Sequence, residues 1–130
     1  AQAVSKVMPE FEGKLTGNAV RVPTPDVSLA IISLHLQDSV TREQINDILL
    51  KHSLSGKLFE QIHFSTDTEF VSSHAIGTTT TSVVDGPSTI VSKDGKQVNI
   101  YAWYDNEYGY ACQVVRLAKS LAKVRRYTYY

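Results

Sequence analysis

Apolar residues recur at helical spacing in three stretches, near the start, the middle and the end of the chain. The first stretch is short and is expected to end at Pro9 or in the turn around Gly13. The middle stretch, 42–51, begins directly after Thr41, and the spacing of Thr41 and Gln44 is that of a capping box at a helix start. The last stretch is carried by Val114, Val115, Leu117, Ala118, Leu121 and Ala122. The pattern therefore predicts three helices.

Most of the remaining apolar positions have the pattern of strands. The plainest strand covers 27–36, and because both of its sides are largely apolar we expect it to be central in a sheet and covered. An extended stretch, 15–25, is expected to hold a strand that ends near Val22, because two prolines follow. The polar part of 72–82 is expected to be loop. Further strands are predicted at 62–65, 79–84, 88–92 and 98–104.

The connections between these elements indicate the fold class. Lys93-Asp94-Gly95-Lys96 contains the Asp-Gly pair of a hairpin turn, so the two strands around it are predicted to pair antiparallel. Hairpins, rather than regular alternation of strand and helix, favour an α+β fold. We expect a mainly antiparallel or mixed sheet with helices packed on one face and a long C-terminal helix. No repeat or low-complexity linker divides residues 1–130, so a single domain is predicted.

Composition narrows the function classes. Acidic and basic residues number 13 each, which argues against binding of nucleic acid or membrane through bulk charge. A local excess of positive charge lies at the end of the last predicted helix, where cations complement the helix dipole, and a phosphate-binding patch is the weaker alternative. Its members are Arg116, Lys119, Lys123, Arg125 and Arg126. With one cysteine, no apolar run of membrane-spanning length and no signal-peptide layout, a cytoplasmic protein is expected.

The sequence contains few candidates for catalytic or metal-binding residues. Cys112 lies within the last predicted helix with no histidine near it in sequence, so it is interpreted as a small buried thiol. The histidines are scattered without metal-ligand spacing, so no metal site is predicted. They are His35, His52, His63 and His74. The seven glycines form no G-x-G-x-x-G motif, so the chain has no dinucleotide-binding fingerprint of its own.

The densest group of candidate binding residues is Trp-Tyr-Asp-Asn-Glu-Tyr-Gly-Tyr at 103–110, between the last strand and the last helix. Asp105 or Asn106 suits the helix N-cap, with Glu107 in the first turn, and this role explains all three without a ligand. The alternative is a corner where aromatic rings surround an amide and hold a flat, amide-bearing ligand. On spacing alone, the aromatic-rich helix start is the favoured interpretation.

Arg21 is the other candidate, because it is a charged residue in an apolar extended stretch ahead of a proline-stiffened turn. A guanidinium held on a rigid backbone is well suited to bind phosphate, because it can donate two parallel hydrogen bonds to it. An ordinary edge-strand arginine is the alternative, and it is favoured when the residue is considered alone.

Both candidate regions resemble the glyceraldehyde-3-phosphate dehydrogenases, and the resemblance covers nearly the whole chain. The octapeptide at 103–110 is similar to the signature near the C-terminus of that family. The other matching segments follow in the family's order: Lys6-Val7-Met8-Pro9-Glu10, Gly13-Lys14-Leu15-Thr16-Gly17 and Arg21-Val22-Pro23-Thr24-Pro25. The resemblance implies that Asn106 meets the carboxamide of the nicotinamide ring, that Tyr110 lies beside the ring, and that Arg21 contacts a phosphate of the substrate.

The resemblance also implies a function for the complete protein: NAD-dependent, phosphorylating oxidation of glyceraldehyde 3-phosphate to 1,3-bisphosphoglycerate in glycolysis, by a cytoplasmic tetramer. The family's catalytic cysteine, histidine base, Thr-Gly phosphate turn and dinucleotide-binding domain all precede the point that matches Ala1, so this chain alone is expected to be inactive. Two alternatives stay open, an enzyme similar to erythrose-4-phosphate dehydrogenase and a non-enzymatic interaction module on the same scaffold.

Two departures from the family pattern are local. After Val71-Ser72-Ser73 the family commonly has an Asp, where this chain has His74. The Tyr-rich ending at 127–130 is expected to pack on another surface, such as a neighbouring subunit.

Overall fold

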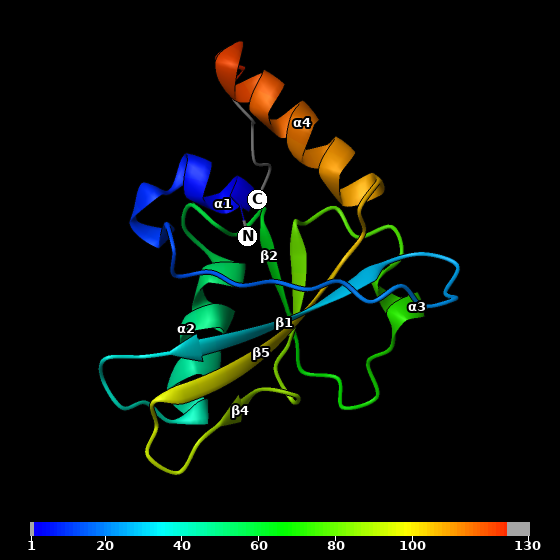
Figure 1. Ribbon diagram of the computed structural model, residues 1–130. Helices are drawn as coiled ribbons and strands as arrows, with labels where there is room; N and C mark the ends of the chain where they lie inside the picture. The colour runs from blue at the N-terminus through cyan, green and yellow to red at the C-terminus, as the bar shows by residue number, and fades with distance from the viewer. Residues whose placement is uncertain (1, 125–130) are drawn as a thin grey trace.

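Residues 2–124 are described in the structure, a computed structural model, and they form one mixed sheet with helices around it (Figure 1). The elements in order are α1 (Gln2–Val7), the 3-10 helix η1 (Pro9–Phe11), β1 (Ser28–His35), α2 (Arg42–Leu54), β2 (Ile62–Ser65), α3 (Ser72–Ala75), β3 (Ser82–Asp85), β4 (Ile90–Val91), β5 (Gln97–Tyr104) and α4 (Tyr108–Leu121). The predicted α+β class, with a mixed sheet and a long C-terminal helix, is confirmed. The Tyr-rich ending lies outside the described residues.

Strand β5 is the centre of the sheet, whose order is β1-β5-β3-β2. Along one side, β1 pairs with β5 antiparallel over its whole length, from Ser28 opposite Tyr104 to His35 opposite Gln97. Along the other side, β3 pairs with the end of β5 and β4 pairs with its start. The pair β2 and β3 is parallel, which makes the sheet mixed. The predicted hairpin between β4 and β5 is confirmed.

The buried core is small and lies mostly on the two central strands β3 and β5. Its apolar members are Val27, Ala75, Val83, Val84, Val98 and Ala102. Helix α2 packs against β2, and α3 contacts β5. The accessible surface of the chain is 10301 Å², whereas a folded monomer of its mass is expected to expose only about 6,800 Å². The chain therefore exposes much more surface than a folded monomer of its mass, and many large apolar side chains are exposed.

Two predictions about the sheet are wrong. Residues 27–36 do form a strand, but β1 lies at the edge of the described sheet, and Ile31 is 59% exposed rather than covered. The strand predicted to end near Val22 is absent, because residues 15–27 form an irregular connection that leads to the start of β1 (Figure 1). Its two prolines have no N–H to donate to a ladder, and no strand of the described sheet pairs with it.

The predicted start of the middle helix, α2, is confirmed. The capping box is complete, since the Thr41 hydroxyl accepts from the Gln44 N–H at 3.2 Å and the Gln44 side chain accepts from the Thr41 N–H at 2.8 Å. The helix continues to Leu54, three residues beyond the prediction. The short helix α3 lies in the stretch expected to be loop, and β3 begins at Ser82 rather than at residue 79.

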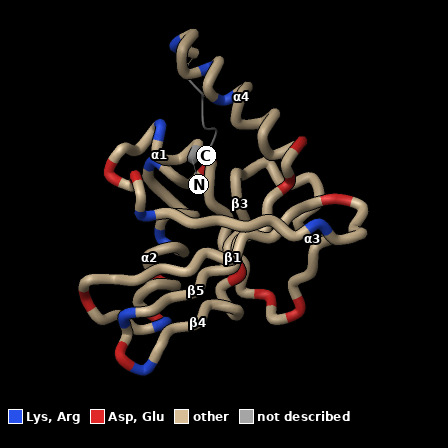
Figure 2. The backbone as a smooth tube through the Cα atoms, viewed as in Figure 1, with Lys and Arg blue, Asp and Glu red and all other residues tan. Residues whose placement is uncertain are grey.

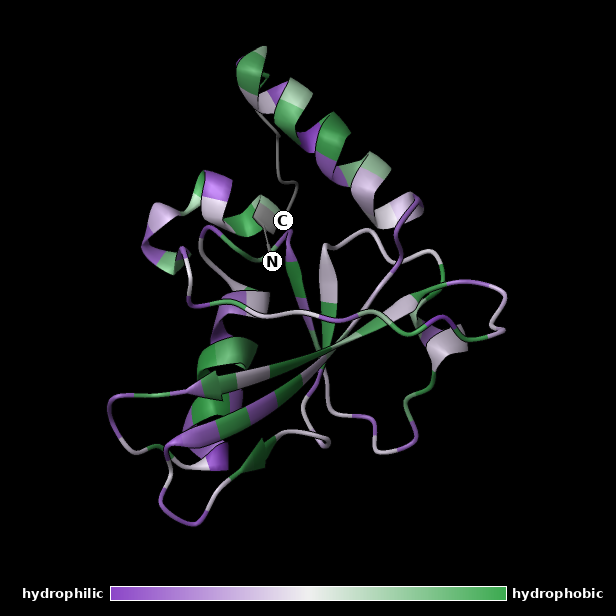
Figure 3. Cartoon of the chain, viewed as in Figure 1, coloured by the Kyte–Doolittle hydropathy of each residue, from purple (hydrophilic) through white to green (hydrophobic). Residues whose placement is uncertain are grey.

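Helix α4 extends beyond the end of the sheet (Figure 1). Most of its apolar side chains are exposed, Leu117 at 58% and Leu121 at 76% among them. Hydrophobic and hydrophilic residues follow one another along this helix (Figure 3). Of the positive residues expected near its end, Arg116 and Lys119 lie in its C-terminal half and Lys123 just after it, whereas Arg125 and Arg126 lie outside the described residues (Figure 2). Cys112 is half-buried on this helix, which corrects the expectation of a buried thiol.

A glycine substitution tests the turn between β4 and β5. Gly95 has φ 73°, and a Cβ added there would lie 2.7 Å from the carbonyl oxygen and 2.8 Å from the nitrogen of Val40. Gly56 also has positive φ, 88°, but nothing lies within 4 Å of the position that a Cβ would occupy there. Gly56→Ala should therefore cost only backbone strain, about 1 to 2 kcal/mol, and Gly95→Ala a further 1 to 3 kcal/mol, roughly, from the clash.

Urea unfolding of the two variants measures this difference. Equal losses of unfolding free energy would show that the contact between the turn and Val40 is loose.

Candidate functional site

The carboxylate of Asp105 holds together the junction between β5 and α4. It is 4% exposed, and its Oδ1 accepts from the N–H groups of Glu107 at 3.0 Å and Tyr108 at 2.8 Å. Its Oδ2 accepts from the N–H of Gly77 at 3.0 Å. One side chain thus satisfies two N–H groups at the start of α4 and ties them to the loop after α3.

The predicted N-cap position is wrong, because neither Asp105 nor Asn106 occupies it. Asp105, two residues before the N-cap, nevertheless supplies the carboxylate that accepts from the N–H groups at the start of α4. Glu107 occupies the N-cap position itself, rather than the first turn, and its side chain makes no capping bond. Asn106 takes no part in capping.

Backbone donors also explain the acidity of Asp105. Hydrogen bonds from the N–H groups of Gly77, then Tyr108, and more weakly of Glu107 and Gly109, stabilise the charged carboxylate and lower the pKa of Asp105 below its ordinary value, although burial opposes this. The carboxylate is therefore ionised at neutral pH.

Asn106 is exposed, and its Nδ2 donates to Oγ of Ser28 at 3.0 Å. The two residues lie 78 positions apart in sequence. They meet because the antiparallel pairing of β1 with β5 places Ser28 opposite Tyr104, two residues before Asn106. The amide of Asn106 is consequently held over the start of β1 and is not used by the helix.

The first half of α4 is anchored by two residues that the sequence analysis did not single out. Gly109 is buried, and a Cβ there would lie 2.9 Å from the Thr80 carbonyl oxygen, so only glycine permits this approach. The side chain of Gln113 donates to the carbonyls of Glu60 and Thr79, each at 3.0 Å. A lone amide among the apolar residues of a helix is the sequence signal that could have identified Gln113.

The aromatic residues of the motif do not form one cluster. Trp103 is half-buried, and its ring centroid lies 6.4 Å from that of Phe70. Tyr108 and Tyr110 are exposed, at 52% and 70%. Tyr110 is thus available on the surface near the start of α4, whereas Trp103 belongs to the sheet.

Arg21 lies on the irregular connection and is exposed. Within residues 2–124 its guanidinium has no hydrogen bond and no ion pair, and the structure does not join it to Asn106 or Tyr110. The connection ends in Val27, a buried β-branched residue with φ 63°, a conformation that costs on the order of 1–3 kcal/mol. Oδ1 of Asp26 accepts from the Val27 N–H at 2.7 Å and so helps to hold this bend.

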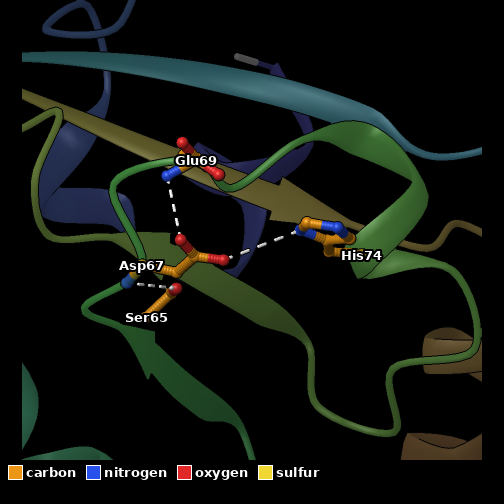
Figure 4. Close-up of polar contacts among 4 residues, drawn as sticks. All are labelled: Ser65, Asp67, Glu69 and His74. Carbon is orange, nitrogen blue, oxygen red and sulfur yellow. Dashed lines mark hydrogen bonds and ion pairs between the residues drawn. The ribbon is translucent and has the colours of Figure 1, made fainter.

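The residue that departs from the family pattern, His74, has local partners (Figure 4). Its Nδ1 lies 3.8 Å from Oδ2 of Asp67, and its ring meets Phe70 edge to face at 5.5 Å. Asp67 is oriented in turn by the N–H of Glu69, which donates to its Oδ1 at 2.9 Å, and by its own N–H, which donates to Oγ of Ser65 at 3.2 Å. Both side chains of the pair are about half exposed, so it contributes little, about 0–1 kcal/mol.

A cavity of about 310 Å³ lies elsewhere, between α2 and the ends of β2 and β3. Arg42 donates to the carbonyl of Pro87 at 2.6 Å and Asn46 to that of Gly86 at 3.0 Å, so their cationic and amide groups hold the turn after β3. None of the predicted site residues lines this cavity.

Within residues 2–124, no group of three or more His, Cys, Asp and Glu side chains could hold a metal ion. No helix of this part of the chain is long and apolar enough to cross a membrane.

Comparison with known proteins gives a consistent family. Residues 1–106 match the family described as "Glyceraldehyde 3-phosphate dehydrogenase, C-terminal domain". The chain is 46% identical over 124 residues to the glyceraldehyde-3-phosphate dehydrogenase-like protein of Pseudomonas aeruginosa. The aligned residues are 95% of this chain and 26% of that protein.

Two further relatives are named as the dehydrogenase itself. The enzyme of Geobacillus stearothermophilus is 43% identical over 122 residues, or 94% of this chain and 36% of its own length. That of Schistosoma mansoni is 42% identical over 124 residues, or 95% of this chain and 36% of its own length. The chain thus spans between a quarter and slightly more than a third of the length of these three relatives.

The pH dependence of stability tests the role of Asp105. Because its folded pKa lies below the unfolded value, the stabilisation is fully present above the ordinary aspartate pKa and is lost as the pH falls through the lowered value. The melting temperature of the unaltered protein should exceed that of Asp105→Asn at neutral pH, and the gap should close only in more acidic solution.

Thermal melts followed by circular dichroism across this pH range provide the measurement. Asp38→Asn is the control, since Asp38 is exposed and accepts no hydrogen bond within residues 2–124. A gap for Asp105→Asn that does not change with pH would contradict the assignment.

Proposed function

We propose that this chain, which belongs to the family of glyceraldehyde-3-phosphate dehydrogenase C-terminal domains, is the C-terminal part of the catalytic domain of an NAD-dependent, phosphorylating glyceraldehyde-3-phosphate dehydrogenase. The complete enzyme would oxidise glyceraldehyde 3-phosphate, with inorganic phosphate, to 1,3-bisphosphoglycerate in glycolysis. The observation on which the proposal rests is the division of roles between Asp105 and Asn106, because capping by the former leaves the exposed amide of the latter available to a ligand.

The cofactor contacts are assigned to the junction of β5 and α4. Asn106 would meet the carboxamide of the nicotinamide ring, since an amide offers that group both a donor and an acceptor. Tyr110 would lie beside the ring, and its exposure of 70% in this chain is compatible with covering a flat ligand.

The substrate contact is assigned to Arg21. Its guanidinium is exposed and has no partner within residues 2–124, so its donors are available to a phosphate. The prolines that follow at 23 and 25 restrict the backbone and so limit the cost of ordering the side chain on binding.

The reaction needs groups that this chain is not proposed to supply. A thiolate must form a thiohemiacetal with the aldehyde, and a base must take the proton as hydride passes to NAD. By the family resemblance these groups, and the dinucleotide-binding domain, belong to the preceding part of the protein. The large accessible surface of the chain supports a protein in which further structure covers β1 and α4. A cytoplasmic homotetramer is proposed for the complete enzyme on the same resemblance.

Substitution of Arg21 tests the substrate contact in the full-length enzyme. Loss of a charge-assisted phosphate contact costs about 1.5–3 kcal/mol, so Arg21→Ala should lower kcat/KM for glyceraldehyde 3-phosphate by roughly 10- to 150-fold. Unphosphorylated glyceraldehyde should be almost unaffected.

Steady-state kinetics with both aldehydes are the measurement, and Arg21→Lys is the matched variant. It keeps the charge but loses the planar fork, so its loss should be intermediate. Equal losses for both aldehydes in Arg21→Ala would make Arg21 a structural residue, and a preference for erythrose 4-phosphate would favour the sister enzyme.

Substitution of Asn106 tests the cofactor contact. Because Asn106 does not cap α4, Asn106→Asp should change the unfolding free energy by only a few tenths of a kcal/mol, roughly. An ionised carboxylate cannot donate to the carboxamide oxygen, and it brings negative charge to a ring that loses positive charge on reduction. The rate of hydride transfer should therefore fall more than the affinity for NAD.

Single-turnover formation of NADH, the dissociation constant for NAD and the melting temperature give the three readouts. The assignment would be abandoned if Asn106→Asp transferred hydride at the unaltered rate.

A further inference from the structure

Ser28 holds the side chain proposed to meet the nicotinamide. Its Oγ accepts from Nδ2 of Asn106 at 3.0 Å, and within the described residues this is the hydrogen bond that the Asn106 side chain makes. Ser28 is half-buried and is the first residue of β1, whereas Asn106 is exposed. A side chain on the surface, with two rotatable bonds, is thereby tied to a point on the sheet.

The position of Ser28 is fixed from both sides. After it, the β1–β5 ladder runs without interruption, with Ser28 opposite Tyr104 and Leu29 opposite Trp103. Before it, Val27 is 8% exposed and has the left-handed φ of 63°. A β-branched residue keeps that conformation only where its surroundings determine it. The Cβ of Ser28 is therefore placed by the backbone, and its hydroxyl can move only by rotation about the Cα–Cβ bond.

The chemistry of the amide explains what this bond achieves. Nδ2 carries two N–H donors and Oδ1 is an acceptor. The bond to Ser28 uses one donor, which leaves one donor and one acceptor for a ligand. A carboxamide on the ligand offers the complementary acceptor and donor. Without Ser28 the amide would sample several rotamers, and only a fraction would present this pair correctly.

We propose that Ser28 is a positioning residue for the cofactor site, which acts on the nicotinamide through Asn106 and does not touch the ring itself. The inference rests on the proposed function, because it takes the carboxamide as the ligand of Asn106. It adds a residue from β1, 78 positions away in sequence, to a site otherwise assigned to the 103–110 motif.

The test compares Ser28→Thr with Ser28→Val in the full-length enzyme. These two side chains have the same shape and the same preference for strands, but only Thr keeps the hydroxyl. Ser28→Thr should transfer hydride at close to the unaltered rate. Ser28→Val should be slower by about five- to tenfold, the factor that corresponds to one ordinary hydrogen bond. The dissociation constant for NAD should change by less than about twofold, because most contacts of the cofactor lie elsewhere.

Ser33→Ala is the control on the same strand. Ser33 is exposed and pairs with Asn99 near the other end of β1, so its substitution should leave the rate unchanged. Melting temperatures of all variants show whether any of them has lost its fold. Ser28→Ala, which is smaller than the native residue, replaces Ser28→Val if the larger side chain prevents folding.

A double-mutant cycle separates this inference from the proposed function. If Ser28 acts through Asn106, Ser28→Val should cause no further loss in a protein that already carries Asn106→Ala. Losses that multiply in the double variant, or equal rates for Ser28→Val and Ser28→Thr, would overturn the positioning role while leaving the Asn106 contact intact. An unaltered rate in Asn106→Ala alone would overturn both.

Discussion

The buried carboxylate of Asp105 is the interaction on which the candidate site depends. A helix start needs acceptors for its first N–H groups, and here one side chain supplies two of them while a third bond reaches the loop after α3. Three segments, β5, the loop at Gly77 and α4, therefore share one acceptor. Protonation of this group would weaken all three bonds together, which makes it an electrostatic support as well as a geometric one.

The consequence for function is that adjacent residues have different tasks. Because Asp105 satisfies the helix, the amide of Asn106 bonds to Ser28 and keeps one donor and one acceptor for the proposed ligand. Had Asn106 been the capping residue, its oxygen would have been used by backbone donors. The aromatic residues also differ in their surroundings. Trp103 packs against Phe70 in the sheet, whereas Tyr108 and Tyr110 are exposed. Structural roles and proposed ligand-binding roles alternate within eight residues.

The rest of the fold holds this junction in place with few contacts. Gly109 and Gln113 fix the first half of α4 through close approach and two carbonyl bonds, and the second half extends past the sheet with its apolar residues exposed. At the edge of the sheet, β1 is also exposed although it carries Ile31 and Ile32. The small valine and alanine core therefore leaves many of the apolar side chains of β1 and α4 exposed.

Features that depend on residues close in sequence could be predicted from the sequence alone: the capping box at Thr41, the Asp-Gly hairpin, the strand β5 and a short acceptor side chain at the start of α4. Which strands lie side by side could be learned only from the folded chain. Two apolar sides made residues 27–36 resemble a central strand, but pairing placed β1 at the edge and brought Ser28 to Asn106. No local pattern encodes such contacts, because their partners are selected by the free energy of the whole sheet rather than by the preference of any one segment.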